Sequence, residues 1–205
     1  TRVGEATIED WEGTQHIVPD GELRWMGARK VENLISDSTG FVGSYHSTFW
    51  STNTFGELDV NGDATALKVT SNNTDPYPYY GTSSTAPYNK VSVEVKPLVG
   101  NVPSVSCGLG SFIFNTATEI VSKVSGTGTA SMRAIGDGWF RVTINSPTSS
   151  SGAIGFRPTR GSQNTDSCLF ARPHASTVSG EEEYIPTTTA PASKWFDTAQ
   201  PTVTN

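Results

Sequence analysis

The sequence predicts an all-β protein: an antiparallel jelly-roll β-sandwich with an extended N-terminal arm and a C-terminal tail. Three observations support this fold class. Apolar and polar residues alternate in several short runs, turn-forming residues separate these runs, and helical periodicity is nearly absent. In addition, only 35% of the 205 residues are hydrophobic and only 17% are charged. The remainder is rich in Gly, Ser, Thr, Asn and Pro, which fits many strands joined by turns.

The clearest strand is KVSVEVKPL, residues 90–98, in which three valines alternate with polar side chains. In GWFRVTINS, residues 138–146, the alternation with Val142 and Ile144 puts Phe140 on the core side and Trp139 on the other side. The best helical candidate is the short stretch SKWFD, residues 193–197. The remaining strand candidates are ALKVTS, VSCGLGSFIFN, TEIVSKVSG, GAIGFRP and DSCLFARPHAS, and the turn candidates are VNGD, PLVGNVP, SGTGT, GDG and SPTSSSG.

The chain divides into an arm or hairpin at residues 1–30, a sandwich at 31–191 and a tail at 192–205. In the arm, the turn PDGE at residues 19–22 could separate two short strands. Trp11 and Trp25 also lie there without a core strand of their own, so we expect them to contact a neighbouring subunit or a capsid. The alternative is that the arm folds back on its own sandwich and adds a pair of strands. The closing stretch GEEEYIPTTTAP, residues 180–191, contains two prolines and is expected to lie extended against the sandwich.

Charge and hydropathy argue against two classes of partner. The net charge is −6 and the densest basic cluster is RWMGARK, residues 24–30, so nucleic-acid binding is not expected. No apolar run approaches the ~18 residues of a membrane helix, so no membrane insertion is expected. The start of the chain shows no signal-peptide pattern. Cys107 and Cys168 lie in apolar strand contexts, where free thiols are favoured and a disulfide is the alternative.

Motifs for metal binding and catalysis are incomplete. Asp59, Asn61 and Asp63 have the spacing that begins an EF-hand loop, but Ala64 and Thr70 stand where that loop needs Gly and Glu. A turn at Asn61–Gly62 is therefore predicted instead. No nucleophile elbow or HExxH motif is present, and the histidines, His16, His46 and His174, form no pattern with acids or nucleophiles. We expect no enzyme.

Four motifs, in order, resemble a jelly-roll domain common in bacteriophage virion proteins. The first is GARKVENLISDSTGF, with Gly27, Ala28, Arg29, Asn33 and Leu34, followed by Phe41 and Trp50. GDATALKVT and GDGWFRVTI resemble later elements of that family, and EEEYIPTTTAP resembles its closing segment. The resemblance covers roughly residues 27–191. The domain is similar to carbohydrate-binding modules of the jelly-roll type.

This resemblance implies a non-enzymatic structural protein of the virion exterior, made in the host cytoplasm. The favoured role is capsid decoration or head fibre, as a homotrimer that contacts the major capsid protein or another virion protein. The alternative is a tail-associated adhesin that binds host-surface glycans. A third hypothesis is a binding module separated from a glycoside hydrolase. The candidates for glycan binding are Tyr77, Tyr79, Tyr80 and Tyr88. The alternative interpretation is that these tyrosines are core residues. No cofactor is expected. The resemblance to jelly-roll binding modules also suggests a structural calcium ion bound by Glu32, Asn33, Asp37 and Ser38. The favoured interpretation is that these four are solvated turn residues.

Overall fold

The computed structural model describes residues 6–9, 15–18, 29–39, 47–49, 51–72, 79–100, 102–159, 166–177, 184–188 and 190–196. Within these residues every regular element is a strand, and the pairings with a described register are all antiparallel. The predicted all-β antiparallel sandwich is therefore confirmed. The strands are β1 (Ala6–Glu9), β2 (Gln15–Val18), β3 (Arg29–Asn33), β4 (Ser47–Phe49), β5 (Ser51–Glu57), β6 (Ala66–Ser71), β7 (Tyr79–Val99), β8 (Ser104–Cys107), β9 (Gly110–Asn115), β10 (Ile120–Gly126), β11 (Thr129–Gly136), β12 (Trp139–Arg157), β13 (Ser167–Ser176) and β14 (Ala192–Phe196).

The chain separates into two compact units. One comprises Thr1–Val31 together with Ser193–Asn205, and the other is Glu32–Ala192. In the first unit, β1 pairs antiparallel with β2. The predicted turn PDGE, residues 19–22, lies outside the described residues. Strand β14 pairs with β3, which makes the predicted helix at SKWFD wrong. Pairing with a strand outweighed the weak local helix signal there.

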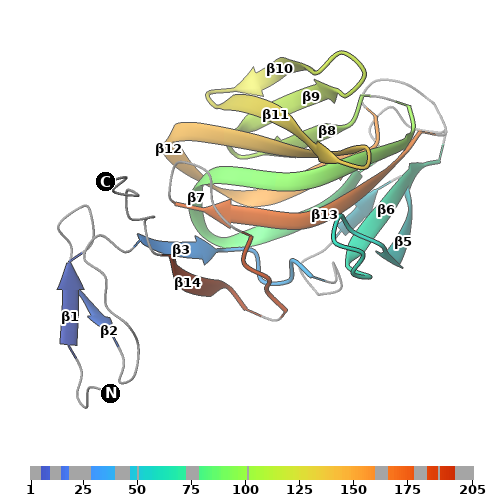
Figure 1. Ribbon diagram of the computed structural model, residues 1–205. Helices are drawn as coiled ribbons and strands as arrows, with labels where there is room; N and C mark the ends of the chain where they lie inside the picture. Colours follow the sequence, from blue (N-terminus) through green and yellow to red (C-terminus); the bar gives the residue numbers. More distant parts are fainter. Residues whose placement is uncertain are drawn as a thin grey trace, which may run out of the picture. The chain divides into compact units, whose positions relative to one another are not determined.

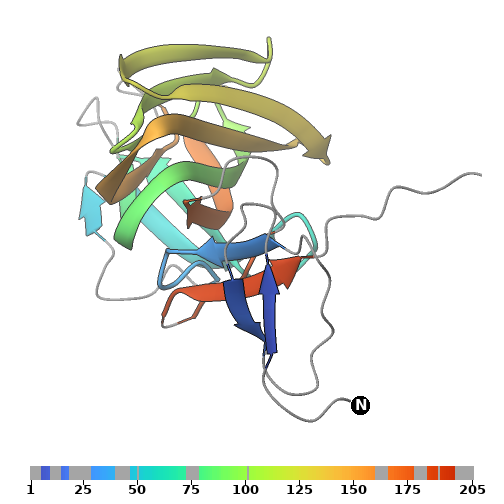
Figure 2. The same cartoon turned by 90° about the vertical axis from the view of Figure 1, so that its left-hand side faces the viewer.

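The larger unit is one ten-stranded sheet folded into two layers (Figures 1 and 2). Strands β7 and β12 are long and curved, and one half of each strand lies in the first layer and the other half in the second. The first layer contains β11, residues 139–146 of β12, residues 90–99 of β7, then β13, β6 and β5. The second layer contains β10, β9, β8, residues 150–157 of β12, residues 79–88 of β7, and β4.

The passage of β12 between the layers corrects one prediction. The stretch SPTSSSG was expected to be a turn but is strand throughout. The register of β12 against β7 shifts between Asn145 and Ser150 and again between Ser150 and Gly152. Such bulges bend a strand without ending it. Turn-forming residues therefore mark a bend here, and the same strand continues into the second layer.

The main core lies between the two layers and is formed by the alternating valines of β7, Val142 and Ile144 of β12, and the phenylalanines of β9. Phe156 and Phe170 join the layers, with ring centroids 5.4 Å apart. A smaller cluster of Ala66, Trp139, Leu169 and Ala171 lies outside this core.

The side assigned to Trp139 was correct, but the burial expected for Phe140 was not. Trp139 faces away from the main core and is nevertheless only 3% exposed, because Val60 and Ile135 pack against its cluster. Phe140 is half-buried and is not part of the main core. Local alternation gave the faces correctly, but it could not show that a loop residue, Val60, covers the outer one.

Candidate functional site

The closing segment of the sandwich is fixed to the segment that opens it through Asn33, which is fully buried. Its Nδ2 donates to the carbonyl oxygens of Ile185 at 2.8 Å and Pro173 at 3.1 Å. Its Oδ1 accepts from the backbone N–H groups of Ile35 and Ala175, both at 3.2 Å. One side chain thus joins its own segment to two backbone segments near the end of the sandwich, at residues 173–175 and at Ile185.

A second contact of this kind joins Ser38 to Thr187. The N–H of Thr187 donates to Ser38 Oγ at 3.0 Å, and the N–H of Ser38 donates to Thr187 Oγ1 at 2.9 Å. Thr187 Oγ1 also donates to the Ile35 carbonyl at 2.7 Å. The Tyr184 hydroxyl donates to the Ser38 carbonyl at 3.0 Å, while Ile185 is only 6% exposed. The closing segment lies against the sandwich as predicted, with Tyr184 and Ile185 as its anchors.

These contacts bear on the proposed calcium ligands. Asn33, Asp37 and Ser38 are buried, so the favoured interpretation as solvated turn residues is wrong for all three. The polar atoms of Asn33 and Ser38 are used in protein hydrogen bonds. In the described part of the chain, no group of three His, Cys, Asp or Glu side chains is arranged to hold a metal ion.

The predicted turn at Asn61–Gly62 is confirmed, and Asp59 organises it. Asp59 Oδ1 accepts from the N–H groups of Asn61 at 2.8 Å and Asp63 at 3.1 Å, and Oδ2 accepts from the Thr65 hydroxyl at 2.8 Å. Gly62 has a φ of 85°, which favours glycine. The EF-hand-like spacing is therefore explained by a carboxylate that caps its own loop.

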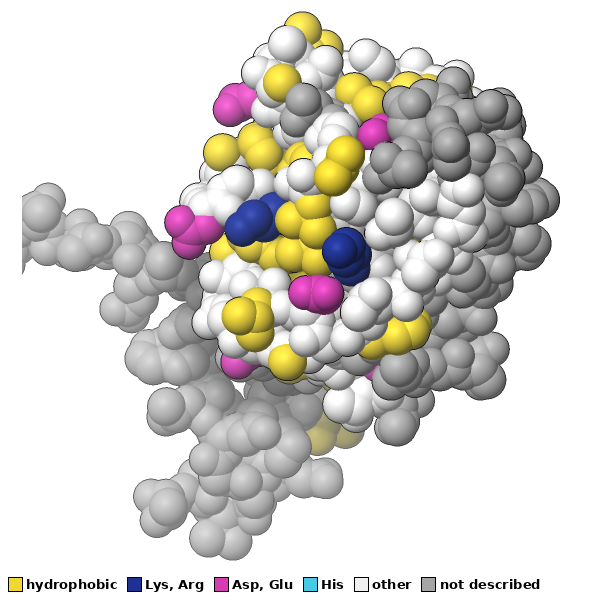
Figure 3. Space-filling model, turned by 90° about the vertical axis from the view of Figure 1, so that its right-hand side faces the viewer, with side chains coloured by type: hydrophobic (Ala, Val, Ile, Leu, Met, Phe, Trp, Pro, Cys, Tyr) yellow, Lys and Arg dark blue, Asp and Glu magenta, His cyan; other side chains and the backbone are white. Residues whose placement is uncertain are grey.

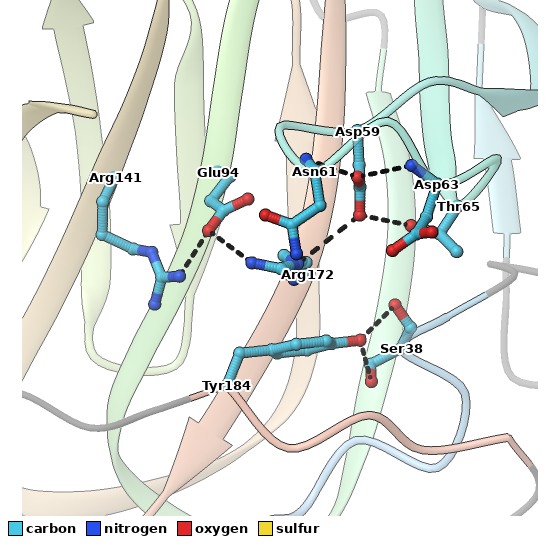
Figure 4. Close-up of polar contacts among 9 residues, drawn as sticks. All are labelled: Ser38, Asp59, Asn61, Asp63, Thr65, Glu94, Arg141, Arg172 and Tyr184. Atoms are coloured by element: carbon cyan, nitrogen blue, oxygen red, sulfur yellow. Dashed lines mark hydrogen bonds and ion pairs between the residues drawn. The ribbon is translucent and has the colours of Figure 1, made fainter. Parts of the chain in front are cut away.

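This loop is tied to the outer face of the first layer by a network of charges (Figure 4). Arg172 Nε lies 3.5 Å from Asp59 Oδ2, and its Nη1 lies 3.6 Å from Glu94 Oε1. Arg141 forms an ion pair and hydrogen bond with the same Glu94 oxygen. The Arg172 guanidinium also lies 5.2 Å from the centre of the Tyr184 ring. Two carboxylates that are only 2% exposed are thus neutralised by two arginines.

Arg172 reaches these partners from an unusual backbone conformation. Its φ is 52°, and the register of β13 shifts between Ala171 and His174. A positive φ in a residue other than glycine is uncommon and persists where surrounding contacts compensate it. The bulge directs the guanidinium toward Asp59, Glu94 and the Tyr184 ring. Burial raises the pKa of Tyr184 to about 12, so this phenol remains a hydrogen-bond donor at neutral pH.

The outer face of the first layer is therefore largely closed. Besides the charge network it carries the Trp139 cluster, and the register places Lys96, Leu169 and Lys68 in one row across β7, β13 and β6. Figure 3 shows the side of the molecule on which β5 and β6 lie, where a small hydrophobic patch is bordered by basic groups and by an acidic group. Most of the described surface around that patch is neither charged nor hydrophobic.

The outer face of the second layer is built differently. The core row Phe156–Val105–Phe112 is buried, so the neighbouring row, Arg157, Ser104 and Ile113, faces outward. The next outward row consists of Gly155, Ser106 and Ser111. Arg157 Nη1 donates to Ser106 Oγ at 3.2 Å, and Ser106 Oγ lies 2.7 Å from Ser111 Oγ. We call these two rows the serine–arginine strip. Ser104 and Ser111 are buried in it, whereas Ser106, Ile113 and Arg157 are half-buried.

The four tyrosines predicted as candidates for glycan binding differ in their positions in the structure. Tyr88 is fully buried in the main core and its hydroxyl accepts from the Gly108 N–H at 3.1 Å, so a surface role for Tyr88 is wrong. Burial raises its pKa to about 12. Tyr79 and Tyr80 lie on β7, where position 80 pairs with Phe156, and their side chains fall outside the described part of the structure. Nothing in the sequence indicated that Arg157 and the serines would share a face.

Other predicted residues fall outside the described part of the chain. Trp11, Trp25, Tyr77 and His46 all lie there. Within it, His174 is 2% exposed and its Nε2 lies 2.9 Å from the Glu32 carbonyl oxygen. Burial lowers the pKa of His174 to about 4 and the nearby charges of Lys90 and Arg141 act in the same direction, while the contact with Glu32 opposes this shift. His174 is therefore neutral at physiological pH, in a structural position.

Both cysteines are free thiols, as favoured from the sequence. Cys168 is fully buried in the main core and Cys107 is half-buried beside it. Burial raises the pKa of both thiols, so neither is a ready nucleophile at neutral pH. The described residues contain no helix long and apolar enough to cross a membrane.

Comparison with known proteins gives no family. No protein-family model matches the sequence, and no curated protein matches it. Among solved structures, similar chains include a carbohydrate binding module of family 29, with 10% identity over 72% of this chain and 90% of that chain and a TM-score of 0.43. Two others are modules of the same family complexed with cellulohexaose and with mannohexaose, each with 10% identity. They cover 72% and 73% of this chain and 92% of their own, with TM-scores of 0.42 and 0.41. Similarity at this level shows no family membership.

Proposed function

We propose that this chain is a non-enzymatic structural protein of the exterior of a bacteriophage particle, a capsid decoration or head-fibre protein that assembles as a homotrimer. The sandwich is the displayed module. The arm, residues 1–30, attaches it to the major capsid protein or another virion protein, with Trp11 and Trp25 in the contact.

The observation that carries this proposal is the meeting of two motifs on which the resemblance to virion jelly rolls rests. Asn33 belongs to the opening motif and Ile185 to the closing motif, 152 residues away, and they are joined by a 2.8 Å hydrogen bond. Ser38 and Thr187 repeat this contact between the same two segments. The two motifs that resemble one family in sequence therefore also contact each other in the structure. This supports treating the resemblance as one structural unit.

The test is deletion of residues 1–26 in the chain as it is carried on phage particles, with occupancy read by cryo-electron microscopy. The proposal expects a truncated sandwich that keeps its melting temperature, is monomeric and no longer attaches. Unchanged occupancy would exclude the arm as the attachment element, and the absence of the full-length chain from particle maps would overturn the virion role itself. Loss of folding would indicate that the arm belongs to the sandwich.

A second function, a tail-associated adhesin that binds host-surface glycans, is favoured by the serine–arginine strip. Hydroxyl and guanidinium groups can bond to sugar hydroxyls, and the strip holds the half-buried Ser106 hydroxyl and Arg157 guanidinium on one sheet face. Binding of the full chain to a glycan array separates this function from a purely structural one.

A further inference from the structure

We propose that Asn61 is a site of spontaneous chemical modification, at which the side-chain amide is lost through a cyclic imide formed with the backbone nitrogen of Gly62. The loop that Asp59 caps sets the rate of this reaction. The site belongs to the folded sandwich and does not depend on either proposed function.

The sequence supplies the reactive pair at one place. Asparagine is a thermolabile residue, and a glycine that follows it leaves the attacking backbone nitrogen unhindered because glycine has no Cβ. Asn61–Gly62 is the only Asn-Gly pair in the 205 residues. Asn53 and Asn115 are each followed by a threonine, whose β-branched side chain shields the backbone nitrogen. Asn61 is therefore expected to react before these two.

The reaction needs water and no other reagent. The Gly62 nitrogen bonds to Cγ of Asn61 and gives up its proton, and the side-chain nitrogen leaves Cγ as ammonia after taking up a proton. Water then adds to one of the two carbonyls of the imide and breaks its bond to the nitrogen. Opening at one carbonyl gives an aspartate. Opening at the other gives an isoaspartate, in which the main chain runs through the former side chain.

Both residues of the pair are open to solvent. Asn61 and Gly62 are exposed, and a Cβ placed on Gly62 would have no heavy atom within 4 Å apart from those of its chain neighbours. Within the described residues, the Asn61 amide makes no hydrogen bond or ion pair, so it is free to turn toward the Gly62 nitrogen. Water and the base that removes the proton therefore reach the reacting atoms.

The folded loop slows the reaction. The Gly62 N–H donates to the Asp59 carbonyl at 3.0 Å, and the N–H groups on either side of it, those of Asn61 and Asp63, donate to Asp59 Oδ1. The Gly62 nitrogen must leave its carbonyl partner before it can attack, so the loop has to open locally first. Asp59 is in turn held by Arg172. The carboxylate that fixes the turn therefore also protects Asn61.

Modification changes the loop that covers the Trp139 cluster. Either product adds a carboxylate between Asp59 and Asp63, and an isoaspartate also lengthens the main chain by a methylene group. That group lies between the two N–H groups that Asp59 Oδ1 holds, so these hydrogen bonds cannot both keep their geometry. Val60, the residue before Asn61, packs against the Trp139 cluster. We therefore expect the isoaspartate form to unfold at a lower temperature than the unmodified chain.

The experiment incubates the full chain at mildly alkaline pH and follows each asparagine by peptide mapping with mass spectrometry. We expect Asn61 to be modified first in the folded chain, and faster when guanidinium chloride unfolds the chain. Asp59→Ala removes the cap and should accelerate the reaction about tenfold. Asp63→Ala is the matched control and should react as the wild type does, because it removes a charge from the same loop but no side-chain hydrogen bond within the described residues.

The outcomes decide separately on the site and on its protection. Faster modification of Asn53 or Asn115, or an unmodified Asn61 in the folded chain after the unfolded chain has reacted completely, would overturn the site. Equal rates in the folded and unfolded chains, or in Asp59→Ala and Asp63→Ala, would overturn the protective role of the cap. If Asp59→Ala fails to fold, Thr65→Val decides in its place. It removes only the hydroxyl that donates to Asp59 Oδ2 and should accelerate the reaction by a smaller factor.

Discussion

The two outer faces of this sandwich have opposite constructions although the same two strands, β7 and β12, run through both layers. The first-layer face is covered by a loop and by the closing segment, and its charges are paired internally. The second-layer face has a serine–arginine strip in which the only charge of the two rows is Arg157. Of the polar side chains in these two rows, Ser106 and Arg157 are half-buried, and Ser104 and Ser111 are buried. We therefore expect the first-layer face to contribute more to stability than the second-layer face does.

The largest effect is expected for Trp139→Ala on the closed face. Trp139 is 3% exposed, and truncation of a buried aromatic side chain costs about 3–5 kcal/mol of unfolding free energy. Urea denaturation measures this loss. Phe140→Ala is the control next along the strand, and its half-buried ring should cost clearly less. Equal costs would mean that the outer cluster is not a second core.

The next effect is a pH dependence from His174, which pairs with Ser92 on the closed face. Its pKa is about 4 when folded and about 6.5 when unfolded, so protons bind the unfolded state first as pH falls. The unfolding free energy should drop by roughly 3 kcal/mol from this group between pH 6.5 and 4. Denaturation across this range, compared with His174→Gln, isolates the contribution. An identical pH profile in the variant would show that His174 is accessible when folded.

A smaller effect is expected for Thr187→Val, which keeps the shape of the side chain but removes the hydroxyl that bonds to Ile35 and Ser38. Leaving these buried partners unsatisfied should cost about 1–3 kcal/mol. Thr188→Val, at an exposed position, is the matched control and should be neutral. Hydrogen exchange of the Ser38 amide, which also bonds to Thr187, should accelerate in the first variant only.

The smallest stability effect is expected on the outer face of the second layer. Ser106→Ala removes contacts with Ser111 and Arg157, but the half-buried guanidinium can bond to water instead, so the change should stay within about 1 kcal/mol. Thermal unfolding measures it. A loss as large as that of Trp139→Ala would show that the strip is structural and would remove the distinction between the faces.

The sequence was sufficient for features that depend on neighbours along the chain. Alternation located β6 at ALKVTS with its observed bounds, and the Asn61–Gly62 turn followed from its residues. It also placed Trp139 on the side away from Val142. It could not show that Trp139 is buried, because Val60 reaches it from another element. For the same reason Tyr88 could not be distinguished from a surface tyrosine.

The site itself was hardly predictable. Arg157 and Ser106 are 51 residues apart in the chain and meet only through the register of β12 and β8. Neither residue belongs to a motif. The hydrogen-bond partners of Asn33 could not be predicted either, because the residues next to an asparagine in the sequence do not show whether its side chain is buried. These contacts depend on strand pairing between residues far apart in the sequence, which local propensities do not determine.

The contact of Asn33 with Ile185 has a consequence for synthesis in the cell. Asn33 leaves the ribosome long before Ile185, and until then its amide lacks the carbonyl to which it donates at 2.8 Å. At translation rates of ~5–20 residues per second, the 152 intervening residues take on the order of ten seconds or more. During that interval the nascent chain carries an incomplete sandwich whose opening segment lacks its contacts with the closing segment. Completion of the fold is thus timed by the appearance of its last segment, and an interrupted nascent chain cannot present a finished domain.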